Sequence, residues 1–152
     1  MKRPRQLLGP LLALFIALVT ISAGPRETAA QAGDVRFATV EVLIDSGAEP
    51  LAAWQLEWSD PSGRASLVGI EGGEHRAFVE PARYDPRALA GGRVVLAAFS
   101  LSDDLPSGRT RVARLHLEVR GADPLLGECR LVAAAGAEGR ELEARVALTA
   151  GG

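Results

Sequence analysis

The stretch Leu51–Pro61, LAAWQLEWSDP, decides the fold of this chain. Its alternate positions Ala52, Trp54, Leu56 and Trp58 are apolar, and the residues between them are small or polar. A repeat of two residues is typical of a β-strand with one buried face. Both tryptophans of the chain point the same way on this strand, so we expect them to be structural residues of the core. The Asp-Pro-Ser-Gly sequence that follows predicts a turn.

Short apolar stretches separated by turn residues continue along the rest of the chain. The clearest is Thr110–Arg120, where apolar and charged residues alternate without a break. The other expected strands are Val35–Ile44, Ala65–Ile70, His75–Val79, Arg93–Leu101, Glu128–Ala135 and Glu141–Thr149. A loop is expected over Pro81–Gly92, with one helical turn near Arg87. About eight or nine strands and no long amphipathic helix predict an all-β protein, an antiparallel β-sandwich or barrel in one domain.

The strand expected at Arg93–Leu101, RVVLAAFSL, is apolar on both of its faces. A strand of this composition is typical of a central position with cover on both sides, or of an inner sheet. We therefore expect Phe99 to be a structural aromatic of the core, together with Trp54 and Trp58.

The N-terminus has the three parts of a secretory signal peptide. Basic residues in Met1–Arg5 precede the apolar run Leu7–Ala23, and small residues near Ala32 form a cleavage site. An uncleaved membrane anchor is the second interpretation, because this apolar helix approaches spanning length. The prediction is a signal segment over residues 1–32 and a domain over 33–152. We expect the protein to be exported to the periplasm, the cell surface or the medium.

Charge and motifs argue against several function classes. Without residues 1–32 the chain keeps 13 basic and 18 acidic residues, a mildly acidic balance that argues against nucleic-acid binding. The histidines His75 and His116 lie in a polar turn and on a polar strand face, and no catalytic motif accompanies them. The single cysteine, Cys129, has no partner for an internal disulfide, and we expect it to be a small buried hydrophobe. We expect no enzyme activity and no cofactor; the alternative is a Ca²⁺ ion at Asp103-Asp104, with help from Asp45 or backbone carbonyls.

Five segments in fixed order carry a resemblance to a known family. They are Val40–Asp45 (VEVLID), Leu51–Pro61, Val68–Gly73 (VGIEGG), Gly92–Ser100 (GRVVLAAFS) and Arg111–Gly121 (RVARLHLEVRG). Over Val35–Leu148 the chain resembles the cohesin-like domains, relatives of the cellulose-binding sandwich modules. In cohesins an aromatic-rich second strand ends in aromatic-Asp-Pro; here Trp58-Ser59 precede Asp60, so the aromatic is displaced by one residue.

The resemblance implies a nine-stranded jelly-roll sandwich that binds rather than catalyses. Cohesins bind dockerin modules through one sheet face, although no residue of this chain carries that specificity over. The first functional hypothesis is an exported module for protein–protein contact at the cell envelope or outside the cell, with an unknown protein partner. The alternative is a carbohydrate-binding module of a polysaccharide-related system, in which Trp54, Trp58 and Tyr84 would form a platform for sugar rings.

The candidate docking surface lies on the polar face of the strand at Thr110–Arg120. Its residues are Arg109, Arg111, Arg114, His116 and Glu118. The alternative interpretation of the same face is a solvated surface held by ion pairs between strands. We expect contact with a membrane only through an uncleaved N-terminal segment.

Overall fold

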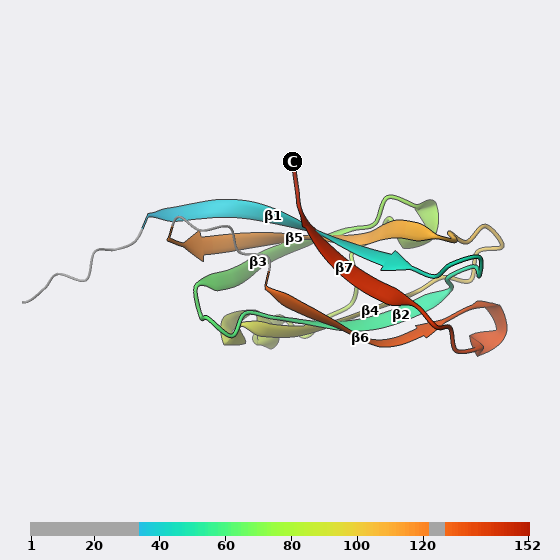
Figure 1. Ribbon diagram of the computed structural model, residues 1–152. Coiled ribbons are helices and arrows are strands. Elements are labelled where there is room, and N and C mark those ends of the chain that lie inside the picture. The colour runs from blue at the N-terminus through green and yellow to red at the C-terminus, as the bar shows by residue number, and fades with distance from the viewer. Residues whose placement is uncertain (1–33, 122–126) are drawn as a thin grey trace, which may run out of the picture.

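Two antiparallel sheets packed face to face form the molecule. The computed structural model describes residues 34–121 and 127–152 (Figure 1). One sheet has the strand order β3 (Ala65–Gly72), β5 (Arg109–Arg120), β1 (Val35–Asp45) and β7 (Arg145–Ala150). The other has the order β4 (Arg93–Phe99), β2 (Ala53–Ser59) and β6 (Glu128–Ala135). These elements form a β-sandwich, which confirms the predicted all-β class.

Strand β2 runs along the centre of the three-stranded sheet. Trp54, Leu56 and Trp58 are all buried, as their alternation predicts. The ring of Trp54 meets the ring of Phe78 edge to face, with centroids 6.2 Å apart. Burial of both tryptophans fixes the inner face of this sheet against the four-stranded sheet.

Strands β1 and β5 form the centre of the four-stranded sheet. They pair in antiparallel register from Val35 opposite Arg120 to Asp45 opposite Arg109, with one shift after Val42. Apolar side chains of both strands alternate inward and are fully buried. These side chains are Val40, Val42, Ile44, Val112, Leu115, Leu117 and Val119.

The structure corrects the expectation for the strand at Arg93–Leu101. Strand β4 lies at an edge of its sheet, and no further layer of the described residues covers its outer face. Val94 and Leu96 point inward and are buried, so the alternation turns Val95 and Phe99 outward. The prediction that Phe99 is a core residue is therefore wrong, because its side chain is 64% exposed.

The expectation of a strand at His75–Val79 is also wrong. This segment forms the short 3-10 helix η1 (Arg76–Phe78), and the Nδ1 atom of His75 accepts a hydrogen bond from the Ala77 amide. The loop that follows contains the 3-10 helix η2 (Pro86–Gly91), in agreement with the expected helical turn near Arg87. A third 3-10 helix, η3 (Ala137–Gly139), follows β6.

Seven strands are found in the described ranges, against about eight or nine expected. Of the eight segments named in the sequence analysis, His75–Val79 is the one without a strand, and two isolated bridges add single pairs elsewhere. These bridges join Arg83 to Ala97 and Ala135 to Glu141.

Cys129 occupies a half-buried position on β6. Burial raises the pKa of its thiol to about 12, so the thiol is protonated at neutral pH. The expectation that it acts as a small hydrophobe agrees with this environment.

The predicted signal segment, residues 1–32, lies outside the described residues. Within residues 34–121 and 127–152, no helix has the length and apolar character needed to span a membrane.

Asp60 organises the turn that ends β2. Its carboxylate accepts hydrogen bonds from the Ser62 amide (3.0 Å), the Ser62 hydroxyl (2.6 Å) and the Ala65 amide (2.6 Å). Burial alone would raise the pKa of Asp60, but these hydrogen bonds outweigh it and hold the pKa below its usual value. The ionised carboxylate thus joins the end of β2 to the start of β3.

Replacing Asp60 with alanine is expected to reduce the free energy of unfolding by about 1–3 kcal/mol at pH 7, because the buried Ala65 amide loses its acceptor. Since the folded-state pKa is lowered, this contribution is fully present above the unfolded pKa of about 4 and is lost as pH falls through the folded value. Urea melts at pH 7 and at about pH 3 should therefore show the largest difference at pH 7. An equal difference at both values would contradict this role. The exposed Asp103→Ala is the control.

Candidate functional site

The polar face of β5 was predicted as the docking surface, and three of its five predicted residues are paired with carboxylates on neighbouring strands. Arg114 lies between Glu41 on β1 and Glu71 on β3, with both pairs in direct register. Its Nε atom donates to Glu41 at 2.7 Å, and its Nη1 atom lies 3.5 Å from Glu71. The hydrogen bond to Glu41 raises the pKa of the Arg114 guanidinium.

Two more of the predicted residues join the same network. The Nε atom of Arg111 lies 3.0 Å from Glu41, and its Nη1 atom donates to the carbonyl of Gly72 at 3.1 Å. The Nε2 atom of His116 lies 2.8 Å from Glu71. This geometry fits the alternative interpretation of the face, a surface held by ion pairs between strands, because a partner would have to replace contacts already made.

The other two predicted residues lie apart from this network. Arg109 is exposed at the first position of β5, opposite Asp45. Glu118 is half-buried near the other end of the strand, and its carboxylate is 4.0 Å from Arg120. The five predicted residues therefore share one strand but do not converge on one site.

The outer face of the three-stranded sheet is different in character. At one end, Glu57 accepts hydrogen bonds from Arg93 (2.5 Å) and Arg130 (3.4 Å), and the contact with Arg93 lowers the Glu57 pKa. At the other end, Ala53 lies between Phe99 and Ala135 in the strand register. The row between these ends consists of Ala97, Gln55 and Ala133. Apart from Gln55 and the larger Phe99, this half of the face is thus built from very small apolar side chains.

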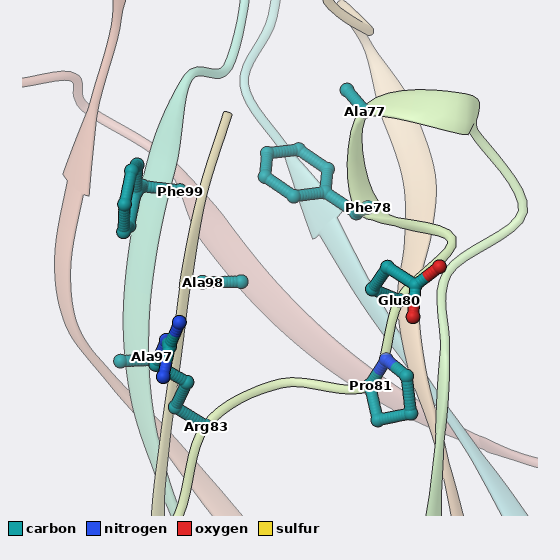
Figure 2. A pocket seen from close by; sticks show the side chains of 8 residues that line it. All are labelled: Ala77, Phe78, Glu80, Pro81, Arg83, Ala97, Ala98 and Phe99. Atoms are coloured by element: carbon teal, nitrogen blue, oxygen red, sulfur yellow. The ribbon is translucent and has the colours of Figure 1, made fainter. Parts of the chain in front are cut away.

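The ring of Phe99 stands among three hollows of this surface. A hollow of about 260 Å³ has a floor of alanines, including Ala97 and Ala133. A second, of about 310 Å³, lies between β4 and the segment from Ala77 to Arg83, and Figure 2 shows Phe99 and Phe78 at its upper end. A third, of about 400 Å³, continues toward the loop after β4. The Phe99-centred surface is the name we give to Phe99, Ala53, Ala97, Ala133 and Ala135.

Exposure of apolar side chains extends this surface. Leu101, two residues beyond Phe99, is 91% exposed, and Val95 and Val132 are also exposed on β4 and β6. A phenyl ring left in water beside alanine-lined hollows is typical of a binding surface rather than of a solvated sheet face. The Phe99-centred surface is therefore the best candidate for a functional site.

Sequence reasoning missed this surface, although a signal was present. The outward positions of β4, Val95, Ala97 and Phe99, are all apolar, and this pattern was interpreted as burial on both faces. The same pattern also describes an edge strand with an apolar outer face. The two interpretations differ in whether another layer covers the sheet, and this cannot be seen in a single stretch of sequence.

The tryptophans do not form a platform for sugar rings. Trp54 and Trp58 are buried, and Tyr84 is half-buried against the core. The Trp54 Nε1 atom is enclosed without a hydrogen-bond partner among the described residues. The aromatic support for carbohydrate binding is therefore lost at these three positions.

Two of the acids considered for Ca²⁺, Asp104 and Asp45, are engaged elsewhere. Asp104 pairs with the Nε atom of Arg76 at 2.5 Å and lies 3.6 Å from His75, whereas Asp45 accepts a hydrogen bond from the Gly47 amide. Across residues 34–121 and 127–152, no three His, Cys, Asp or Glu side chains come together as metal ligands. These residues give no geometric basis for a metal centre.

Comparison with known proteins identifies no relative. No protein-family model matches the chain, and neither a curated protein nor a solved structure matches it significantly. The likeness to cohesin-like domains therefore remains a prediction that rests on the sequence segments quoted above.

Proposed function

We propose that this chain is an exported, non-catalytic protein-binding module of the cohesin-like jelly-roll type. It docks its partner through the Phe99-centred surface. Export rests on the signal-like N-terminus. The jelly-roll assignment is supported by the two antiparallel sheets and by the order of the sequence segments.

One observation carries the docking proposal: Phe99 is exposed on a sheet face where its neighbours are alanines and hollows. Burying a phenylalanine side chain contributes about 1.5–3 kcal/mol, and aromatic residues in pockets dominate many protein interfaces. The ion-paired face of β5 offers no comparable gain, because Arg111, Arg114 and His116 already have partners. The Phe99-centred surface thus replaces the sequence-based candidate.

Replacing Phe99 with alanine is expected to weaken partner binding about 10–100-fold, since each factor of ten corresponds to about 1.4 kcal/mol. The partner is first obtained by crosslinking in cells that make the protein, and its affinity for the purified variants is then measured by calorimetry. Ala133→Glu should also weaken binding, because it places a charge on the alanine floor.

Phe37→Ala is the matched control. Phe37 is 75% exposed on β1 of the opposite sheet, so the same chemical change is made outside the proposed surface. We expect its affinity to stay within about twofold of the wild type. Loss of binding in Phe37→Ala with retention in Phe99→Ala would move the docking surface to the four-stranded sheet and end this proposal.

A further inference from the structure

At Ala97 the edge of β4 is paired with another segment of the chain, and beyond Ala97 this pairing ends. Arg83 and Ala97 form an antiparallel bridge, with the Arg83 amide donating to Ala97 at 2.8 Å and the Ala97 amide donating to Arg83 at 3.0 Å. Continuing this register by two residues places Pro81 opposite Phe99. Proline has no backbone N–H and cannot extend the pairing. Figure 2 shows Pro81 on the far side of the hollow from Phe99.

The backbone of Phe99 faces this opening. On an antiparallel strand, residues two apart direct their N–H and C=O groups to the same side. Ala97 directs both groups away from β2 toward Arg83, so Phe99 directs its own groups toward the same edge. The next amide, that of Ser100, points the other way and donates to Ala52 at 2.8 Å. One residue of sheet edge is therefore presented beside the 310 Å³ hollow.

The hollow combines apolar walls with two charged side chains, Arg83 and Glu80. Phe78, Ala98 and Phe99 supply the apolar part. Arg83 lines both this hollow and the alanine-floored one, and Figure 2 shows its guanidinium beside Ala97. Within the described residues, the Arg83 side chain has no carboxylate within ion-pair distance. Glu80 lines the hollow from the segment that leaves the edge.

We propose that an extended segment of the partner protein adds to β4 as a strand at Phe99. Its backbone pairs with the Phe99 N–H and C=O groups, an apolar side chain enters the hollow, and a nearby carboxylate pairs with Arg83. The open edge demands extended backbone, and the Arg83 charge demands an acidic residue, so the occupant is an apolar–acidic strand rather than a helix. This inference rests on the proposed function for the identity of the ligand as a protein.

The test uses a displayed library of random linear twelve-residue peptides, selected on the purified protein. We expect the selected peptides to share β-forming apolar residues beside Asp or Glu. Bound to the protein, the strongest of them should slow hydrogen exchange of the Phe99 amide at least tenfold, as measured by NMR. Arg83→Glu should weaken binding of this peptide at least tenfold. Peptides selected from the library on this variant should carry basic residues in place of Asp or Glu. Arg87→Glu makes the same charge change on exposed η2 and should leave the affinity unchanged.

Three results would overturn the strand addition. They are an empty selection, a peptide that binds without slowing exchange at Phe99, and equal weakening by Arg83→Glu and Arg87→Glu. Self-association of the protein that protects the same amide would assign the edge to a second copy and would also overturn it. A different result is that no peptide binds, while Phe99→Ala and Ala133→Glu still weaken binding of the crosslinked partner. That result would retain the Phe99-centred surface as the docking surface and overturn strand addition alone.

Discussion

Replacing Trp58 with alanine is expected to lower the free energy of unfolding by about 3–5 kcal/mol. The Trp58 side chain is fully buried, and β2 holds it between Val94 on β4 and Cys129 on β6. Its ring also packs closely on Gly127, where a Cβ atom would lie 2.5 Å from the indole Nε1. Removing the ring leaves a cavity that the surrounding strands fill only in part.

Urea denaturation of the two proteins measures this loss. Phe99→Ala is the matched control, because it removes an aromatic ring from the same sheet but from its exposed face. We expect Phe99→Ala to cost less than about 1 kcal/mol. A Trp58→Ala loss as small as that of the control would contradict the assignment of the inner face.

Replacing Gly72 with alanine is expected to cost about 3 kcal/mol, at the upper end of overpacking effects. A Cβ atom at Gly72 would lie 1.9 Å from the carbonyl oxygen of Val79 and 2.8 Å from that of Glu80. These contacts are with backbone, so the segment leading to Pro81 would have to move away from β3. The same segment borders the hollow beside Phe99.

Thermal or urea unfolding of Gly72→Ala checks this cost. Gly91→Ala is the control, since a Cβ at Gly91 would meet nothing within 4 Å. The control should be within about 1 kcal/mol of the wild type, because alanine also restricts the unfolded chain. Equal stability of the two variants would show that the segment at Val79 is not held against β3.

The sequence predicts the inner faces of the strands well, for a local reason. Burial of Trp54 and Trp58 follows from alternation within β2 and from the size of the rings. The alternation of β5 likewise separates the buried Leu115 and Leu117 from the half-buried Arg114. These contacts depend on side-chain direction along one strand, which a single stretch of sequence contains.

The outer faces are decided by the order of strands in the sheets, which no single stretch contains. Phe99 was expected in the core because β4 is apolar on both sides, but among the described residues no third layer lies over this sheet, so the outer face of β4 is in water. The charged face of β5 was correctly placed outside, but its pairing with Glu41 and Glu71 depends on neighbours from β1 and β3. The best candidate site is therefore the apolar Phe99-centred surface and not the charged face of β5 that the sequence predicted.

The most direct test of the docking surface is NMR of alanine methyl groups, with and without the crosslinked partner. Ala53, Ala97 and Ala133 report on the Phe99-centred surface, and the exposed Ala147 on β7 reports on the opposite sheet. The proposed function predicts that the first three methyl signals shift or broaden when the partner binds, while that of Ala147 does not change. A shift confined to Ala147, with the three outer methyls of the three-stranded sheet unchanged, would contradict it.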